Sequence, residues 1–120
     1  MVDGQGWADL PVLLSGPGVE IRAQEAQGMT NAIIRLGAGF DARPVFAGLP
    51  GDHCQVPHWG YVISGRLKLW MQDGSCRFYA PGELFTWEPG HAPAADEETE
   101  YVELSPTDEY RALMRHVTGA

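Results

Sequence analysis

The stretch that decides the fold reads Tyr61-Val-Ile-Ser-Gly65-Arg66-Leu-Lys-Leu-Trp70-Met-Gln-Asp73-Gly74. Within it Leu67, Leu69 and Met71 alternate with Lys68, Trp70 and Gln72, which is the period-2 pattern of a strand with one buried face. Ser64-Gly65 and Asp73-Gly74 are typical hairpin turns and bound this strand on both sides. We therefore expect consecutive strands to pair antiparallel here.

Short segments of the same kind recur along the chain. Fifteen glycines and nine prolines punctuate the sequence, and the intervals between them suit strands better than helices. Many short strands with regular turns predict an all-β sandwich or barrel. The expected strands are Val19–Ala23, Thr30–Leu36, His58–Ile63, Arg66–Gln72, Arg77–Ala80, Leu84–Trp87 and Glu100–Leu104.

One short α-helix is expected at the C-terminus, over residues 106–120. Ser105 is suited to cap it, Pro106 to occupy its first position, and Asp108 follows three residues after the cap, as in a capping box. The apolar residues of this segment form a stripe that we expect to pack on the outside of the sheet. They are Tyr110, Ala112, Leu113, Met114 and Val117.

Length and charge limit the remaining possibilities. A chain of 120 residues with 44% hydrophobic content has room for one hydrophobic core and so for one domain. Within that domain we expect an N-terminal extension or edge strand (1–25), a barrel (26–105) and the helix (106–120). The net charge is −8 and the eight Lys and Arg are scattered, so we expect no nucleic-acid partner. There is no long apolar run and no basic leader, which predicts a cytoplasmic protein that does not enter membranes.

Three of the four histidines and one of the two cysteines lie between residues 53 and 91. His53, Cys54 and His58 form one cluster, and His91 follows Pro89-Gly90 in the other. Neutral imidazole and thiolate are preferred ligands of borderline transition metals. Strands that are adjacent in a small barrel point such residues into one interior, so we expect His58 and His91 to converge in its mouth.

The stretch from His53 to Pro93 resembles the two sequence motifs of the cupin superfamily, G-x5-H-x-H-x3,4-E-x6-G and G-x5-P-x-G-x2-H-x3-N. The segment Tyr61–Arg66 is similar to the end of the first motif, and Ala80-Pro-Gly82 through Pro89-Gly90 is similar to the second. The resemblance implies a cupin-type antiparallel β-barrel (double-stranded β-helix or jelly roll). It also implies a homodimer, for which the N-terminal segment is a candidate edge or exchanged strand.

The chain departs from these motifs at the metal ligands. Counting back from Gly65 puts His58 where cupins place a glutamate. The preceding histidine of the motif falls on Cys54 with one permitted spacing and on His53 with the other. In the second motif Pro93 stands at the histidine position, and His91 lies two residues earlier.

We therefore predict a metal site formed by His58 and His91, with His53 or Cys54 as the third ligand. The expected cofactor is a divalent transition metal, zinc, iron, manganese or nickel, and Cys54 shifts the preference towards zinc or copper. Glu103 lies in an apolar strand. One interpretation is that its carboxylate is exposed at the surface or forms an ion pair. The other is that it orients a histidine or transfers a proton. Cys54 is a second candidate for proton transfer.

Three functions follow from the resemblance. The first is a metal-dependent dioxygenase, isomerase, lyase or cyclase acting on a small neutral or aromatic molecule. The second is a non-enzymatic module that senses a ligand or a metal, which the altered ligand set favours. In the third, His58 and His91 only form hydrogen bonds, no metal is bound, and the protein is a structural or sugar-binding relic.

Overall fold

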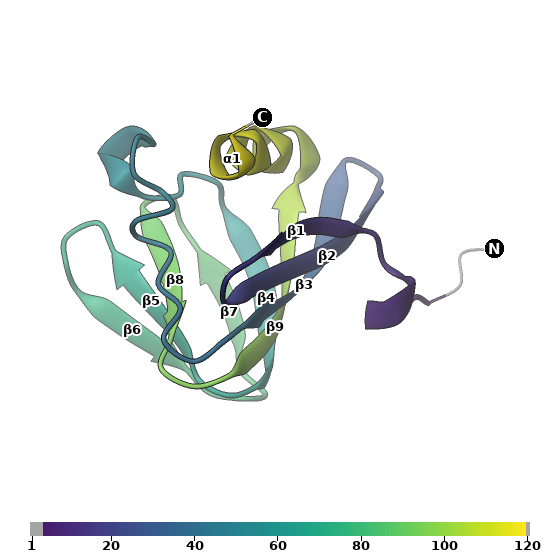
Figure 1. The fold of residues 1–120 in the computed structure, drawn as a ribbon, viewed down its shortest axis with the longest axis horizontal. Helices are drawn as coiled ribbons and strands as arrows, with labels where there is room; N and C mark the ends of the chain where they lie inside the picture. The colour runs from purple at the N-terminus through teal and green to yellow at the C-terminus, as the bar shows by residue number, and fades with distance from the viewer. Residues whose placement is uncertain (1–3, 120) are drawn as a thin grey trace.

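The computed structural model describes residues 4–119, which form two facing antiparallel sheets and one C-terminal helix (Figure 1). The large sheet has the strand order β1-β2-β3-β9-β4-β7 and the small sheet the order β6-β5-β8. The predicted all-β class is confirmed. The bounds are β1 Val12–Gly16, β2 Val19–Ala26, β3 Met29–Leu36, β4 His58–Ser64, β5 Leu67–Met71, β6 Cys76–Tyr79, β7 Leu84–Trp87, β8 His91–Ala95, β9 Thr99–Pro106 and α1 Thr107–Thr118.

Only one of the two expected hairpin turns joins paired strands. Asp73-Gly74 connects β5 to β6, which pair antiparallel. The expectation for Ser64-Gly65 was wrong, because this turn carries the chain from the large sheet into the small one, where β5 pairs with β6 and β8. Gly65 has a φ of 80°, and a Cβ there would collide with the Glu98 carbonyl oxygen. This crossing therefore requires glycine.

One strand was not expected from the sequence, and another was expected only as a candidate edge or exchanged strand. The latter, β1, lies at the edge of the large sheet and pairs with β2 of the same chain. β8 reads His91-Ala-Pro-Ala-Ala, and both alanine and proline are depleted in strands, so nothing local marks it. Its pairing with β5 places it in the small sheet. The division of the chain at residues 25 and 105 stays a prediction.

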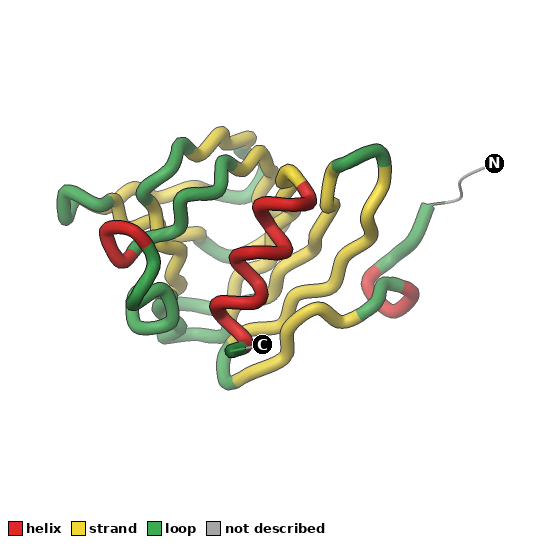
Figure 2. Tube along the Cα trace, turned by 90° about the horizontal axis from the view of Figure 1, so that it is seen from above, coloured by secondary structure: helices red, strands yellow, loops and turns green. Residues whose placement is uncertain are grey.

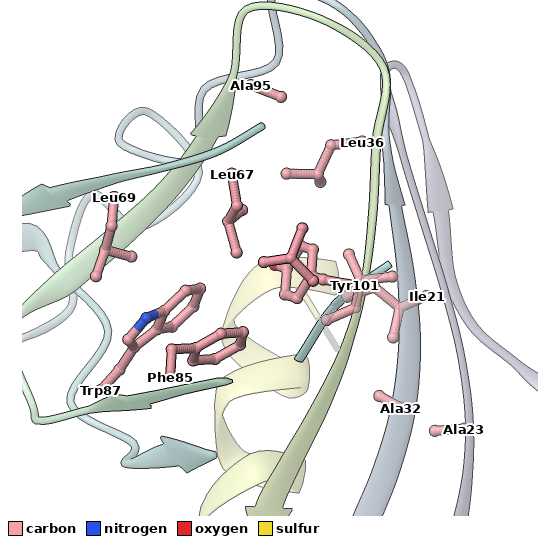
Figure 3. Close-up of a cluster of buried hydrophobic side chains, with 12 residues drawn as sticks. Ile21, Ala23, Ala32, Leu36, Leu67, Leu69, Phe85, Trp87, Ala95 and Tyr101 are labelled. Atoms are coloured by element: carbon pink, nitrogen blue, oxygen red, sulfur yellow. The ribbon is translucent and has the colours of Figure 1, made fainter. Parts of the chain in front are cut away.

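The core fills the space between the two sheets (Figure 3). In β7 the residues alternate, so that Phe85 and Trp87 are buried while Leu84 faces out. The Phe85 and Trp87 rings stack with their centroids 4.2 Å apart, and Tyr101 of β9 lies 5.9 Å from Trp87. Leu67 and Leu69 cover them from β5, as the alternation predicted.

Helix α1 lies across one end of the space between the sheets, not on the outside of a sheet as expected (Figures 1 and 2). Tyr110 and Leu113 are buried in a second cluster with Ala42 and Phe46. Pro106 is the N-cap residue, and the predicted cap was wrong because Ser105 continues β9 and pairs with Thr30 of β3. No helix within residues 4–119 has the length and apolar character needed to cross a bilayer.

Candidate metal and ligand site

Cys54, His58 and His91 meet between the two sheets. His58 begins β4 of the large sheet and His91 begins β8 of the small sheet. The Sγ atom of Cys54 and one ring nitrogen of each histidine all lie within 4.8 Å of one another, and all three residues are buried. This is the spacing at which three side chains can share one metal ion.

The backbone fixes Cys54 beside His91. The Cys54 amide donates to the His91 carbonyl oxygen at 2.9 Å, and the His91 amide donates to the Cys54 carbonyl oxygen at 3.2 Å. The two residues thus form an isolated antiparallel bridge. Because directly opposed residues of such a bridge project to the same side, their side chains reach the same point.

One nitrogen of His91 is free to bind a ligand. Its Nδ1 lies 2.7 Å from the Glu88 carbonyl oxygen, and since a carbonyl only accepts, Nδ1 carries the hydrogen. Nε2 therefore bears the lone pair. This atom is buried and finds no hydrogen-bond partner within residues 4–119. A fixed tautomer with an unpaired Nε2 is the usual state of a histidine that coordinates metal.

His58 is held by two residues of β9. Its Nδ1 lies 2.7 Å from the Ser105 hydroxyl, and its Nε2 lies 3.1 Å from Oε1 of Glu103. The Cys54 sulfur is 3.5 Å from the same Nε2. Residues 103 and 105 share the inward face of β9 because successive side chains of a strand alternate.

Burial makes the whole group neutral in the absence of a cation. It raises the pKa of Glu103 to about 8 and that of the Cys54 thiol to about 12. It lowers the pKa of His91 to about 4, and, helped by His91, it lowers the pKa of His58 well below its usual value. Ionised carboxylates and thiolates need a nearby positive charge at such depth, which a bound divalent ion provides.

A cavity of about 250 Å³ lies next to this group. His58, His91, Glu103 and Tyr110 contribute the polar part of its wall. Most of the remaining wall is aliphatic or aromatic and comes from both sheets, α1 and the segment between β3 and β4, with residues such as Ile21, Leu36, Phe40, Phe46 and Leu113. The site is therefore an apolar pocket with polar groups gathered in one part of it.

Comparison with solved structures identifies the fold. Neither a protein-family profile nor a curated protein matches the chain. Solved structures do match. They include the polyketide cyclase RemF from Streptomyces resistomycificus, at 16% identity over 88% of this chain and 80% of that one, with a TM-score of 0.67. An RmlC-like cupin from Shewanella frigidimarina matches at 14% identity over 85% and 88%, with a TM-score of 0.62. The chain has the cupin fold. KdgF from Halomonas sp. gives a third match, at 19% identity over 88% and 94%, with a TM-score of 0.61.

The cupin fold brings together most of the residues singled out in the sequence. His58, His91 and Cys54 form the group of three, and Glu103 contacts His58. His53 lies apart from that group: it is only half-buried, and its Nδ1 is 2.8 Å from the Gly51 carbonyl oxygen. Glu103 is buried and not exposed at the surface, and its carboxyl lies beside the ring of His58.

Two polar residues of this candidate site were missed in the sequence. Ser105 was assigned to the helix cap, although its place two residues after Glu103 puts both side chains on one face of a strand. Tyr110 was counted only as part of an apolar stripe. No local sequence pattern predicts that its side chain lines the cavity, because this depends on where α1 packs.

Proposed function

We propose that this cupin binds a divalent transition metal through Cys54, His58 and His91, and a small uncharged organic molecule in the adjoining cavity. The observation that carries the proposal is the unpaired, buried Nε2 of His91. His91 belongs to a group with Cys54 and His58 in which one ligand atom of each residue lies within 4.8 Å of the others. An apolar wall with no Lys or Arg among its described residues favours an uncharged ligand.

The donor set fits a borderline or soft ion. One thiolate and two imidazoles favour zinc, copper, iron or nickel over manganese or magnesium. Cys54, His58 and His91 would hold the ion, which would supply a Lewis acid for an oxygen of the bound molecule.

The protein's own residues hold and move a proton. Without a metal ion, burial raises the pKa of the Glu103 carboxyl to about 8. The carboxyl lines the cavity, so it is placed to exchange a proton with a bound molecule. Ser105 fixes the imidazole of His58 through Nδ1. A polyketide cyclase and an ectoine synthase have related folds, which leaves an enzymatic role open without choosing its reaction.

A second candidate function is a ligand-binding module without metal. Ser105, His58 and Glu103 form a hydrogen-bonded chain that satisfies both nitrogens of His58 without an ion. Under this alternative the Nε2 atom of His91 would pair with the organic ligand itself.

Metal analysis separates the two functions. We expect tag-free protein to bind close to one equivalent of Zn²⁺ or Co²⁺, and His91→Ala or His58→Ala to weaken binding about tenfold or more, since each removes a ligand. With Co²⁺ we expect a thiolate charge-transfer absorption band that Cys54→Ser abolishes. Circular dichroism spectra establish that each variant is folded.

His53→Ala and His116→Ala are the matched controls, because both rings contact backbone carbonyl oxygens away from the group of three. These variants should keep the affinity of the unmodified protein. Equal metal content in His91→Ala, His58→Ala and the unmodified protein would refute the site, as would a larger loss in His53→Ala.

A further inference from the structure

Tyr110 lines the cavity and carries a buried hydroxyl without a hydrogen-bond partner. Helix α1 buries this residue to 2% exposure, and its ring centroid lies 6.0 Å from that of His58. The hydroxyl forms no hydrogen bond with any residue from 4 to 119. An unsatisfied buried hydroxyl costs about 1–3 kcal/mol, so packing alone would favour phenylalanine at this position.

The size and chemistry of the cavity limit what can satisfy this hydroxyl. A volume of about 250 Å³ corresponds to roughly eight water molecules at ~30 Å³ each, which is the size of a single substituted ring. Most of the wall is apolar and its polar groups are gathered near His58. The best complement is therefore a hydrocarbon ring with one oxygen.

We propose that Tyr110 is the anchor for a carbonyl oxygen of an uncharged, single-ring ligand. At neutral pH a phenol is a hydrogen-bond donor, and a carbonyl is the acceptor that completes it. The inference rests on the proposed function for the location of the ligand, but it does not require a metal. Tyr110 is in this sense a positioning residue that sets which part of the ligand faces His58 and Glu103.

Two probes of the same shape test the anchor. Acetophenone and ethylbenzene share a ring and a two-carbon chain and differ in the carbonyl oxygen. We expect calorimetric titration of chelator-treated protein to show that Tyr110→Phe weakens acetophenone binding about five- to tenfold, as one lost hydrogen bond predicts. Ethylbenzene binding should change less than twofold.

Tyr61→Phe is the matched control, because Tyr61 is an exposed tyrosine on the outer face of β4. It should alter neither affinity. An equal loss for both probes in Tyr110→Phe, no loss for either, or no binding of either probe to the unmodified protein would overturn the anchor. Because the protein is metal-free in this assay, a failure of the metal site leaves the result interpretable.

Discussion

Replacing Gly60 with alanine is expected to destabilise the fold by about 3 kcal/mol or more, the cost of overpacking a well-packed interior. Gly60 lies in the middle of β4, opposite Phe85 of β7 and Glu103 of β9. A Cβ at this position would collide with the Val102 carbonyl oxygen and with the Phe85 ring. Relief requires a shift of β4, which would disturb the pairing that carries His58.

Urea unfolding measures this effect against a domain stability of ~5–15 kcal/mol. Gly16→Ala is the matched control. Gly16 also lies in a strand, β1, and a Cβ there would meet only a Val19 methyl at an ordinary 3.9 Å. We expect that control to change the free energy of unfolding by less than about 1 kcal/mol. A similarly small change for Gly60→Ala would show that the neighbouring strands leave room for a methyl group at residue 60, against the close contacts described.

The second large effect is on the pH dependence of stability. Burial raises the pKa of Glu103 from 4.5 to about 8, so between these values the folded protein holds a proton that the unfolded chain has released. The free energy of unfolding then falls as pH rises, by at most about 1.4 kcal/mol per pH unit. The stabilisation is complete below pH 4.5 and is lost as pH rises to about 8.

Glu103→Gln should remove this slope. An amide N–H donates to His58 Nε2 as the protonated carboxyl does, but it does not ionise. The variant should therefore resemble the unmodified protein near pH 4.5 and exceed its stability by a few kcal/mol near pH 9. The lowered pKa values of His91, about 4, and of His58 destabilise both proteins as pH falls below 6.5, so the difference between the two proteins above pH 6.5 reports on Glu103.

Urea titrations of chelator-treated protein across this pH range provide the measurement. Glu100→Gln is the control, because Glu100 is a partly exposed partner of Arg35 and its removal should leave the slope almost unchanged. A Glu103→Gln variant with the slope of the unmodified protein would mean that the carboxyl is ionised, or hydrated, in the folded state.

The sequence predicted the fold wherever structure follows from neighbouring residues. The alternation of Leu67 and Leu69 gave the buried face of β5, and Asp73-Gly74 gave its hairpin. β8 was missed because alanine and proline carry no strand preference there. Ser64-Gly65 was misread because a turn between sheets and a hairpin use the same residues, and only distant pairing separates them.

The candidate site shows the same limit. His58 and His91 were singled out by residue type and by the cupin resemblance, but spacing along the chain left Cys54 and His53 as equal alternatives for the third position. The structure puts Cys54 beside the two histidines, through hydrogen bonds between residues 54 and 91 that no local pattern encodes. Ser105 and Tyr110 belong to the site for similarly non-local reasons.

The segment between β3 and β4 forms two isolated backbone bridges with one strand, β8. Asp41 pairs with Ala94 and Cys54 with His91, both in β8, while Val45 and Phe46 between them line the cavity. Insertions and replacements between these two bridges can therefore reshape the cavity without moving Cys54 or His91. In evolutionary terms, the cavity wall and the group formed by Cys54, His58 and His91 can diverge separately, so related chains can change the shape of the cavity while keeping that group.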